Sequence, residues 1–327
     1  MAVIRRIMLR GALIAVALAA TFAIGLLVGR EMMRPPPAPR DSPTASVDAP
    51  PPAAAPALLG YRQLLTIPLD LARPRGIASA QDGTLWVCGD RSLAHVDRSG
   101  AVKARFALDG EPRCVTLGPH GRIIVGMSDH VEVVDPATGN ADSWADLGSE
   151  AIVTSVAAGS SGVFVADAGN GMVLRFDTGG KLLGRFDKGF VVPSAHFDVA
   201  VAADGSLWAA NPGGHCVRHY AADGALLSSW GAASSAVAGF QGCCNPAAIA
   251  LLPCGALVTG EKGFVRVKVY EPDGSLSSVV AQPAEFPVGD PSIDIATRKA
   301  HGGEIIVLVP LEKAVRVFVK KDSTDDE

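Results

Sequence analysis

The residues of this chain that can carry chemistry are its cysteines, and two of them are adjacent. Cys243 and Cys244 stand in the segment Gly242-Cys243-Cys244-Asn245-Pro246, and His215 and Cys216 precede them in the chain. Thiolate and imidazole groups are ligands that suit zinc or copper. Neighbouring thiols can also be oxidised to a disulfide in an oxidising compartment. The pattern therefore indicates a soft metal site, a redox pair or a structural bridge.

An apolar run near the N-terminus predicts a membrane anchor. Residues 11–29 are uncharged and mostly apolar, and they are long enough to cross the hydrocarbon layer as a helix. Arginines precede the run, so the positive-inside rule predicts that residues 1–10 are cytoplasmic and that the rest lies outside. A signal peptide cleaved after Ala17-Leu18-Ala19 is the alternative. The paired arginines Arg5 and Arg6 also resemble a twin-arginine export signal.

The remaining chain divides by composition. Residues 30–57 are rich in Pro and Ala, which is typical of an extended tether. Residues 58–321 are expected to fold as one domain, and residues 322–327 form an acidic tail. The chain has a net charge of −4, although basic residues prevail before the tether, so the folded part is acidic. Nucleic-acid binding is disfavoured, because it depends on neutralising phosphates.

Six copies of one sequence pattern fill residues 58–321. Each copy has an apolar strand, a Gly turn, a short β-branched or aromatic strand and an alternating strand; the second strands contain Leu85-Trp86-Val87, Ile123-Ile124-Val125, Val163-Phe164-Val165, Leu207-Trp208-Ala209, Ala256-Leu257-Val258 and Ile305-Ile306-Val307. A period of roughly 40 to 50 residues with four strands per unit predicts an all-β, six-bladed β-propeller. The last copy lacks its fourth strand. We expect Tyr61 to Leu69 to supply it and to close the ring.

The third copy resembles an NHL repeat. The segment from Val165 to Asp177 has a strand ending in Ala-Asp, a Gly-Asn loop and an alternating strand with Arg, as that family has. The resemblance extends more loosely to other copies and implies a six-bladed propeller. It implies little about function, because the family includes scaffolds, RNA binders and several enzymes.

Propeller topology predicts which residues share a face. The start of each first strand and the loop between the second and third strands lie on the same face, so the candidate ligand-binding residues gather there; they are Arg75, Arg113, His196, Asp198, His215, Asn245, Glu261, Lys262 and Asp290. Glu261 and Lys262 can instead be a solvated ion pair. Arg266 and Lys268 are expected on an outward polar surface, and the two tryptophans Trp86 and Trp208 are expected to pack between blades.

Five of the six cysteines fall on this face. Cys88 and Cys114 come from neighbouring blades, as do Cys216 and the pair Cys243-Cys244, so inter-blade disulfides Cys88–Cys114 and Cys216 with Cys243 or Cys244 are one prediction. Buried free thiols that pack as small apolar groups are the alternative. A third interpretation is a zinc or copper site made by Cys216, Cys243, Cys244 and His215, although no Cys-x-x-Cys spacing supports it. A vicinal Cys243–Cys244 disulfide is a fourth. No cofactor is expected apart from that metal alternative.

Common enzyme motifs are missing from the sequence. It has no nucleophile elbow, phosphate loop or His-Glu-x-x-His motif. Six-bladed lactonases hold a metal with acidic and Asn residues around the central channel. Asp198, Asn211, Glu261 and Asp290 could form a similar set of ligands here, but their spacing in the sequence gives no reason to choose them. We expect a membrane-anchored, periplasmic or other extracytoplasmic propeller that binds a protein or a small ligand. The alternative is a redox or metal-dependent enzyme or accessory protein that uses the Cys216, Cys243 and Cys244 cluster.

Overall fold

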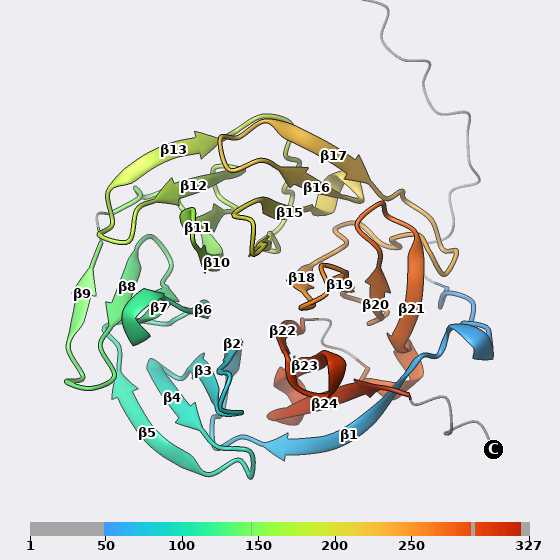
Figure 1. Ribbon diagram of the computed structural model, residues 1–327, viewed down its shortest axis with the longest axis horizontal. Helices are drawn as coiled ribbons and strands as arrows, with labels where there is room; N and C mark the ends of the chain where they lie inside the picture. Colours follow the sequence, from blue (N-terminus) through green and yellow to red (C-terminus); the bar gives the residue numbers. More distant parts are fainter. Residues whose placement is uncertain (1–48, 145, 289–291, 322–327) are drawn as a thin grey trace, which may run out of the picture. The chain divides into compact units, whose positions relative to one another are not determined.

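The computed structural model describes residues 49–144, 146–288 and 292–321, which form a closed β-propeller of six blades (Figure 1). Each blade is a four-stranded antiparallel sheet. The predicted anchor at residues 11–29, most of the tether, the acidic tail and Asp290 lie outside these ranges. Among the residues that are described, no helix is long and apolar enough to span a membrane.

The blades follow one another around the ring in chain order, and within blades 1 to 5 the strands run in chain order from the centre outward (Figure 1). Blade 1 contains β2 (Pro74–Ser79), β3 (Leu85–Gly89), β4 (Ser92–Val96) and β5 (Val102–Ala107). Blade 2 contains β6 (Cys114–Leu117), β7 (Ile123–Gly126), β8 (Val131–Val134) and β9 (Ala141–Ser143). Blade 3 contains β10 (Val153–Gly159), β11 (Gly162–Asp167), β12 (Met172–Phe176) and β13 (Leu182–Phe186). Blade 4 contains β14 (Val199–Val201), β15 (Leu207–Asn211), β16 (Cys216–Tyr220) and β17 (Leu226–Trp230). Blade 5 contains β18 (Ala248–Leu251), β19 (Leu257–Gly260), β20 (Val267–Tyr270) and β21 (Leu276–Ala281).

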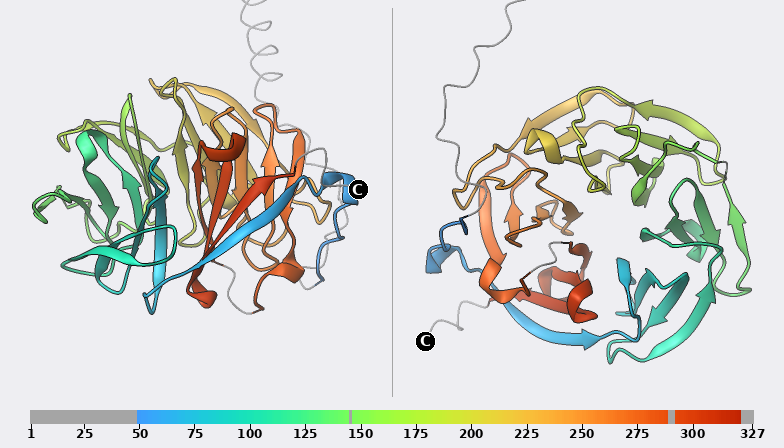
Figure 2. Two further views of the ribbon diagram at one scale, coloured as in Figure 1. Left: turned by 60° about the horizontal axis from the view of Figure 1, so that its bottom comes forward. Right: turned by 180° about the vertical axis from the view of Figure 1, so that it is seen from behind.

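Blade 6 joins the two ends of the folded region, as predicted. Its strands are β22 (Asp294–Arg298), β23 (Glu304–Val309), β24 (Ala314–Lys320) and β1 (Tyr61–Pro68). The strand β1 runs antiparallel to β24, with Tyr61 opposite Lys320 and Pro68 opposite Ala314. Figure 2 shows β1 lying along the outer edge of this blade. This pairing satisfies the main-chain hydrogen-bonding groups at the outer edge of β24 and closes the ring.

The hydrophobic core is divided among the spaces between neighbouring blades. Six clusters of buried apolar side chains each combine residues of two adjacent blades, for example Val258 of blade 5 with Ile305 of blade 6. Each blade is therefore buried on both faces, which explains why its second strands read as continuous apolar runs.

The two tryptophans pack between blades, as predicted. Trp86 is 6% exposed and stacks on His95 with ring centroids 4.3 Å apart. The His95 Nε2 lies 2.8 Å from Oγ1 of Thr84, and that hydroxyl donates to Asp82. Blade 4 repeats this arrangement with Trp208, His219, Ser206 and Asp204. The histidine of blade 4 is thus part of the packing rather than a surface residue.

Short 3₁₀ turns connect several of these elements, namely η1 (Pro56–Leu58), η2 (Pro119–Gly121), η3 (Pro212–Gly214), η4 (Pro283–Glu285), η5 (Ala300–Gly302) and η6 (Pro310–Glu312). The end of the predicted tether lies against blade 5. The Ala49 carbonyl accepts a hydrogen bond of 2.7 Å from Gln241, and the Ala54 N–H donates one of 2.8 Å to Gln282. The part of the tether from Ala49 onward therefore belongs to the folded domain.

Candidate functional site

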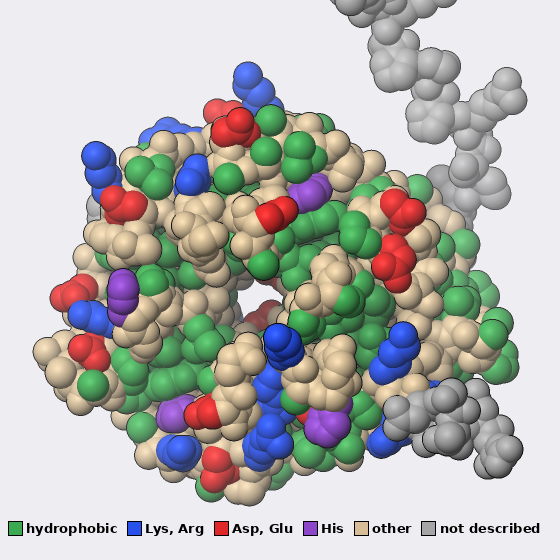
Figure 3. All heavy atoms as spheres, in the orientation of Figure 1, with side chains coloured by type: hydrophobic (Ala, Val, Ile, Leu, Met, Phe, Trp, Pro, Cys, Tyr) green, Lys and Arg blue, Asp and Glu red, His purple; other side chains and the backbone are tan. Residues whose placement is uncertain are grey.

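The inner strands of the blades line a central channel with a volume of about 740 Å³. Figure 3 shows one opening of this channel at the centre of the ring, with backbone and uncharged polar side chains around much of its edge and basic side chains over blades 1 and 6. Ala, Val and Ile dominate the inner strands, yet polar atoms form at least as much of the channel wall as apolar atoms do. Polar groups that converge in a cavity fix the orientation of a ligand and give specificity.

One position of the repeat supplies several of these polar groups. It directly precedes a β-branched residue near the start of each inner strand and is occupied, from blade 1 to blade 6, by Gly76, Cys114, Ser155, Asp198, Ala248 and Asp294. Three of these side chains accept a hydrogen bond from a main-chain N–H of an adjoining blade. The donors are Val199 to Ser155 (3.3 Å), Ile249 to Asp198 (2.6 Å) and Ile77 to Asp294 (2.8 Å). The polar groups therefore join one blade to the next.

The two carboxylates are held in the same way. The second oxygen of Asp198 accepts the N–H of Val199 at 2.9 Å, and that of Asp294 accepts the N–H of Ile295 at 2.8 Å. Each carboxylate thus bridges the main chains of two blades. Its orientation at the channel wall is fixed before any ligand arrives.

Both carboxyl groups have raised pKa values. Burial raises the pKa of Asp198 to about 6, against hydrogen bonds from Ser155, Ile249 and Val199, which lower it. Burial raises the pKa of Asp294 to about 7, and the negative charge of Asp198 adds to the increase. Interacting carboxyl groups titrate as a pair. The pair therefore exchanges protons near neutral pH, where it can both donate and accept hydrogen bonds.

His196 stands two residues before Asp198 and also lines the channel. Its Nε2 lies 3.3 Å from Oγ of Ser292, which stands two residues before Asp294, and its Nδ1 lies 3.3 Å from Oγ of Ser194. The contact with Ser292 links blade 4 to the start of blade 6. The imidazole is thereby positioned at the same end of the channel as the carboxyl pair.

Three arginines line the channel, Arg73 and Arg75 from blade 1 and Arg113 from blade 2. Arg73 is paired with Asp90 and Glu111. Arg75 is exposed, whereas Arg113 is half-buried and its Nε donates to Oγ of Ser128 at 3.3 Å. The basic groups and the acidic groups thus come from different blades. A ligand in the channel is offered positive charge from blades 1 and 2 and carboxyl groups from blades 4 and 6.

The structure brings together four of the predicted site residues, namely Arg75, Arg113, His196 and Asp198. The other described candidates, His215, Asn245, Glu261 and Lys262, do not line the channel. Three of them belong to the loops of blade 5, and His215 precedes β16 in blade 4.

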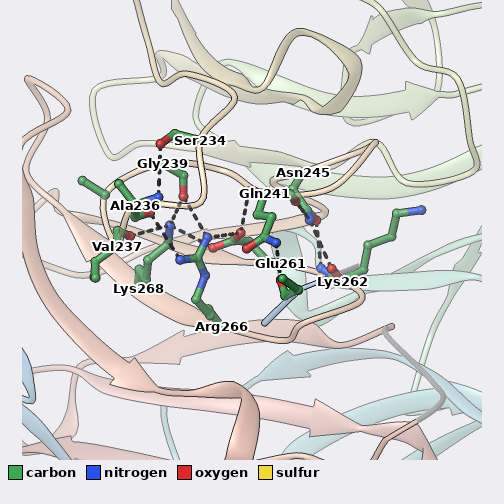
Figure 4. A network of polar contacts seen from close by, with 12 residues as sticks. Ser234, Ala236, Val237, Gly239, Gln241, Asn245, Glu261, Lys262, Arg266 and Lys268 are labelled. Carbon is green, nitrogen blue, oxygen red and sulfur yellow. Dashed lines mark hydrogen bonds and ion pairs between the residues drawn. The ribbon is translucent and has the colours of Figure 1, made fainter. Parts of the chain in front are cut away.

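Glu261 is the centre of a buried ion cluster, which corrects two predictions (Figure 4). Its carboxylate lies 2.7 Å from Nη2 of Arg266 and 2.8 Å from Nζ of Lys268, and all three side chains are at most 3% exposed. The expectation of a solvated Glu261–Lys262 pair was wrong, as was that of an outward surface for Arg266 and Lys268. The reason is the loop at residues 232–240, which folds over β20.

That loop satisfies the cations with main-chain oxygens. The carbonyl of Gly239 accepts from Lys268 at 2.7 Å and from Arg266 at 3.0 Å, and Tyr270 donates to the carbonyl of Ala238 at 2.9 Å. Burial lowers the pKa of Lys268 to about 8, partly offset by the charge of Glu261. The cluster holds the loop in place, and none of its three side chains lines the channel.

Asn245 and Lys262 form a main-chain clamp beside this cluster. The Asn245 side chain accepts the N–H of Lys262 at 2.8 Å and donates to its carbonyl at 3.1 Å. The Lys262 side chain points away from the cluster in Figure 4. Asn245 therefore fixes the loop between β19 and β20.

All six cysteines are free thiols in the structure. Cys88 and Cys114 lie beside the same glycine, because a Cβ on Gly76 would be 3.0 Å from Sγ of Cys88 and 2.8 Å from Cα of Cys114. The Sγ atoms of Cys243 and Cys244 are 3.2 Å apart, beyond the bond length of about 2.05 Å. The predicted disulfides are thus not formed, although neighbouring blades do bring Cys88 close to Cys114.

The soft metal site receives no geometric support. Within residues 49–144, 146–288 and 292–321, no group of three or more His, Cys, Asp or Glu side chains is arranged to hold a metal ion. The thiol of Cys216 accepts from the Asn211 amide at 3.6 Å. Burial lowers the pKa of His215.

Sequence reasoning missed Asp294 and Ser292. The signal was present in the repeat, since Phe197-Asp198-Val199-Ala200 and Ile293-Asp294-Ile295-Ala296 share one pattern of apolar residue, Asp, β-branched residue and Ala. Aligning the starts of the inner strands would have identified the second aspartate as the partner of the first.

No family model and no curated protein matches this sequence. Solved structures do resemble it. Virginiamycin B lyase from Staphylococcus aureus has a TM-score of 0.55 and 12% identity, over 80% of this chain and 100% of that one. A streptogramin B lyase structure has a TM-score of 0.53 and 13% identity, over 82% and 100%. The WD40 β-propeller domain of Doa1 has a TM-score of 0.57 and 17% identity, over 81% and 98%. At these identities the similarity shows the β-propeller fold alone.

Proposed function

We propose that this chain is a membrane-anchored, extracytoplasmic β-propeller that binds a small polar ligand in the mouth of its central channel. The observation that carries the proposal is the carboxyl pair Asp198 and Asp294, preset by main-chain hydrogen bonds at the wall of the channel. The volume of about 740 Å³ is in the range of small-molecule sites. The site is preorganised, which lowers the cost of binding.

The charges of the channel define the chemistry of the ligand. A group that both donates and accepts hydrogen bonds suits the carboxyl pair and His196, and an anionic group suits Arg75 and Arg113. We therefore infer a dipolar ligand, with an amine or hydroxyl at one end and an acidic group at the other. A segment of a partner protein that carries the same groups is the other occupant to test.

A binding screen on the full chain in detergent tests this proposal. Amino acids, short peptides and hydroxy acids are added, and binding is measured by calorimetry or by the shift in melting temperature. Compounds that bind should lose at least tenfold in affinity in Asp198→Asn and in Arg113→Ala. Lys103→Ala, on the exposed outer strand of blade 1, is the matched control. Hits that bind both channel variants as tightly as the control would place the ligand elsewhere.

The cellular setting is part of the proposal. It is supported by the apolar run at residues 11–29, by the basic residues before it and by the Pro/Ala-rich stretch at residues 30–57. Reporter fusions at the C-terminus test it, since a periplasmic reporter should be active and a cytoplasmic one inactive. The opposite result would reverse the proposed orientation.

A redox accessory function is the second candidate. One observation favours it, namely the 3.2 Å separation of the Cys243 and Cys244 thiols. The NHL-like motif is compatible with either candidate, because that fold serves many functions.

A further inference from the structure

Cys243 and Cys244 lie in the loop that leads from blade 4 into β18. Successive side chains of an extended strand point to opposite sides, yet here the two Sγ atoms are 3.2 Å apart. The loop therefore turns both thiols to the same side. This arrangement is independent of the channel ligand.

The two thiols differ in accessibility. Cys243 is exposed, whereas Cys244 is 3% exposed. Burial raises the pKa of Cys244, and the neighbouring thiol of Cys243 raises it further. A hydrogen bond with Ser194 and the positive charge of Lys262 act in the opposite direction and lower this pKa. A reagent from solvent thus meets Cys243 first, and Cys244 is held within reach behind it.

Two thiols alone limit the chemistry of this loop. No third His, Cys, Asp or Glu in the described part of the chain completes a metal site around them. A structural zinc ion needs four protein ligands. What remains for two adjacent thiols is two-electron oxidation or the capture of a bidentate thiol reagent.

We propose that Cys243 and Cys244 form a reversible oxidation site, which a disulfide oxidant converts into a vicinal disulfide. The Cys243 thiolate attacks one sulfur of the oxidant, forms a mixed disulfide and releases the first thiolate. The Cys244 thiolate then attacks Sγ of Cys243 and releases the second. The cysteines lose two protons and two electrons, and the oxidant becomes two thiols.

The geometry of neighbouring residues makes this bond easy to reduce. The Cα atoms of adjacent residues are about 3.8 Å apart, whereas the Cα atoms of ordinary disulfides are about 4.4–6.8 Å apart. Such strain raises the reduction potential. The oxidised pair is therefore a labile site rather than a structural staple.

Phenylarsine oxide tests the reduced form, because its trivalent arsenic binds two thiols together with release of water. The full chain in detergent should bind one equivalent that a dithiol displaces but a monothiol does not. Cys254→Ser removes the other exposed cysteine and should leave binding unchanged. Cys243→Ser should abolish it, and so should Cys244→Ala. Retention of binding in Cys243→Ser would show that the pair is not the chelating site.

Mass spectrometry tests the oxidised form. Trypsin releases residues 219–262 as one peptide that holds Cys243, Cys244 and Cys254, so the Cys254→Ser protein is used to assign the bond. After treatment with oxidised glutathione, this peptide should lose the mass of two hydrogens and should not react with iodoacetamide. Mild dithiothreitol should restore both thiols. A glutathione adduct that persists on Cys243, or two free thiols after treatment, would overturn the proposal.

Discussion

Asp198 in blade 4 and Asp294 in blade 6 occupy the same position of the repeat, and each accepts a main-chain N–H from the blade that follows it. The donors are Ile249 and Ile77. This equivalence lets one carboxylate pin two inner strands together while it faces the channel. The packing of the inner strands and the proposed ligand site therefore depend on the same two side chains, which makes them informative to mutate.

The carboxyl pair predicts an unusual pH dependence of stability. The folded pKa values of about 6 and about 7 exceed the ordinary value of 3.8, so the native state binds more protons than the unfolded state. The contribution of the pair to stability is then largest below pH 4 and falls as the pH rises towards 7. Urea unfolding at pH 5 and pH 8 measures this.

Asp294→Asn is the variant for that experiment. An amide lacks one of the two acceptor oxygens, so the variant should be less stable than the wild type at pH 5. The difference should shrink at pH 8, where the wild type carries the cost of ionisation. A difference that is constant, or that grows with pH, would show that the pair is ionised over the whole range.

The buried cluster around Glu261 predicts a large loss of stability when the charge of Glu261 is removed. Glu261→Gln leaves Arg266 and Lys268 without a counter-charge in the core, and breaking such a pair costs about 3–5 kcal/mol. Chemical denaturation measures the free energy of unfolding. Asp70→Ala is the control, because the Asp70–Arg105 pair is exposed and should contribute less than about 1 kcal/mol. Similar losses in both variants would contradict the role given to burial.

Ring closure through β1 predicts a strong effect at Val317 of β24. This residue is 2% exposed and pairs with Leu65 on one side and Ile306 on the other. Val317→Pro removes a main-chain donor in the middle of a sheet and should cost more than the loss of packing alone. Val317→Ala retains the N–H and loses only packing, at about 2 kcal/mol. Equal unfolding free energies for the two variants would argue against the pairing.

Thiol reactivity should follow burial. Ellman's reagent is itself a disulfide oxidant, so in the native, reduced chain Cys254 should release one equivalent of its chromophore and the Cys243–Cys244 pair should release two. The buried thiols Cys88 and Cys114 should react only after denaturation. Protein isolated without reductant tests the inter-blade bridge. If Cys88 and Cys114 stay unreactive in denaturant until a reductant is added, they form a disulfide in the cell. If they react with the reagent as soon as the protein is denatured, they are free thiols in the cell.

The sequence determined the blade count, the position of the second strands and the closure by Tyr61 to Pro68. These features are local or periodic, because a repeated pattern of β-branched residues and Gly turns specifies each blade by itself. The same periodicity predicted that Arg75, Arg113, His196 and Asp198 share one face of the ring and that Trp86 and Trp208 pack between blades.

Only the tertiary structure decided what Glu261 and Asp294 contact. The partners of Glu261 are set by the loop at residues 232–240, which has no regular pattern and whose path follows from packing on β20. The link between Asp294 and Ile77 joins residues at opposite ends of the folded region and exists only once the ring is closed. Side-chain chemistry is written in the sequence, but proximity across a closed ring depends on how all six blades pack.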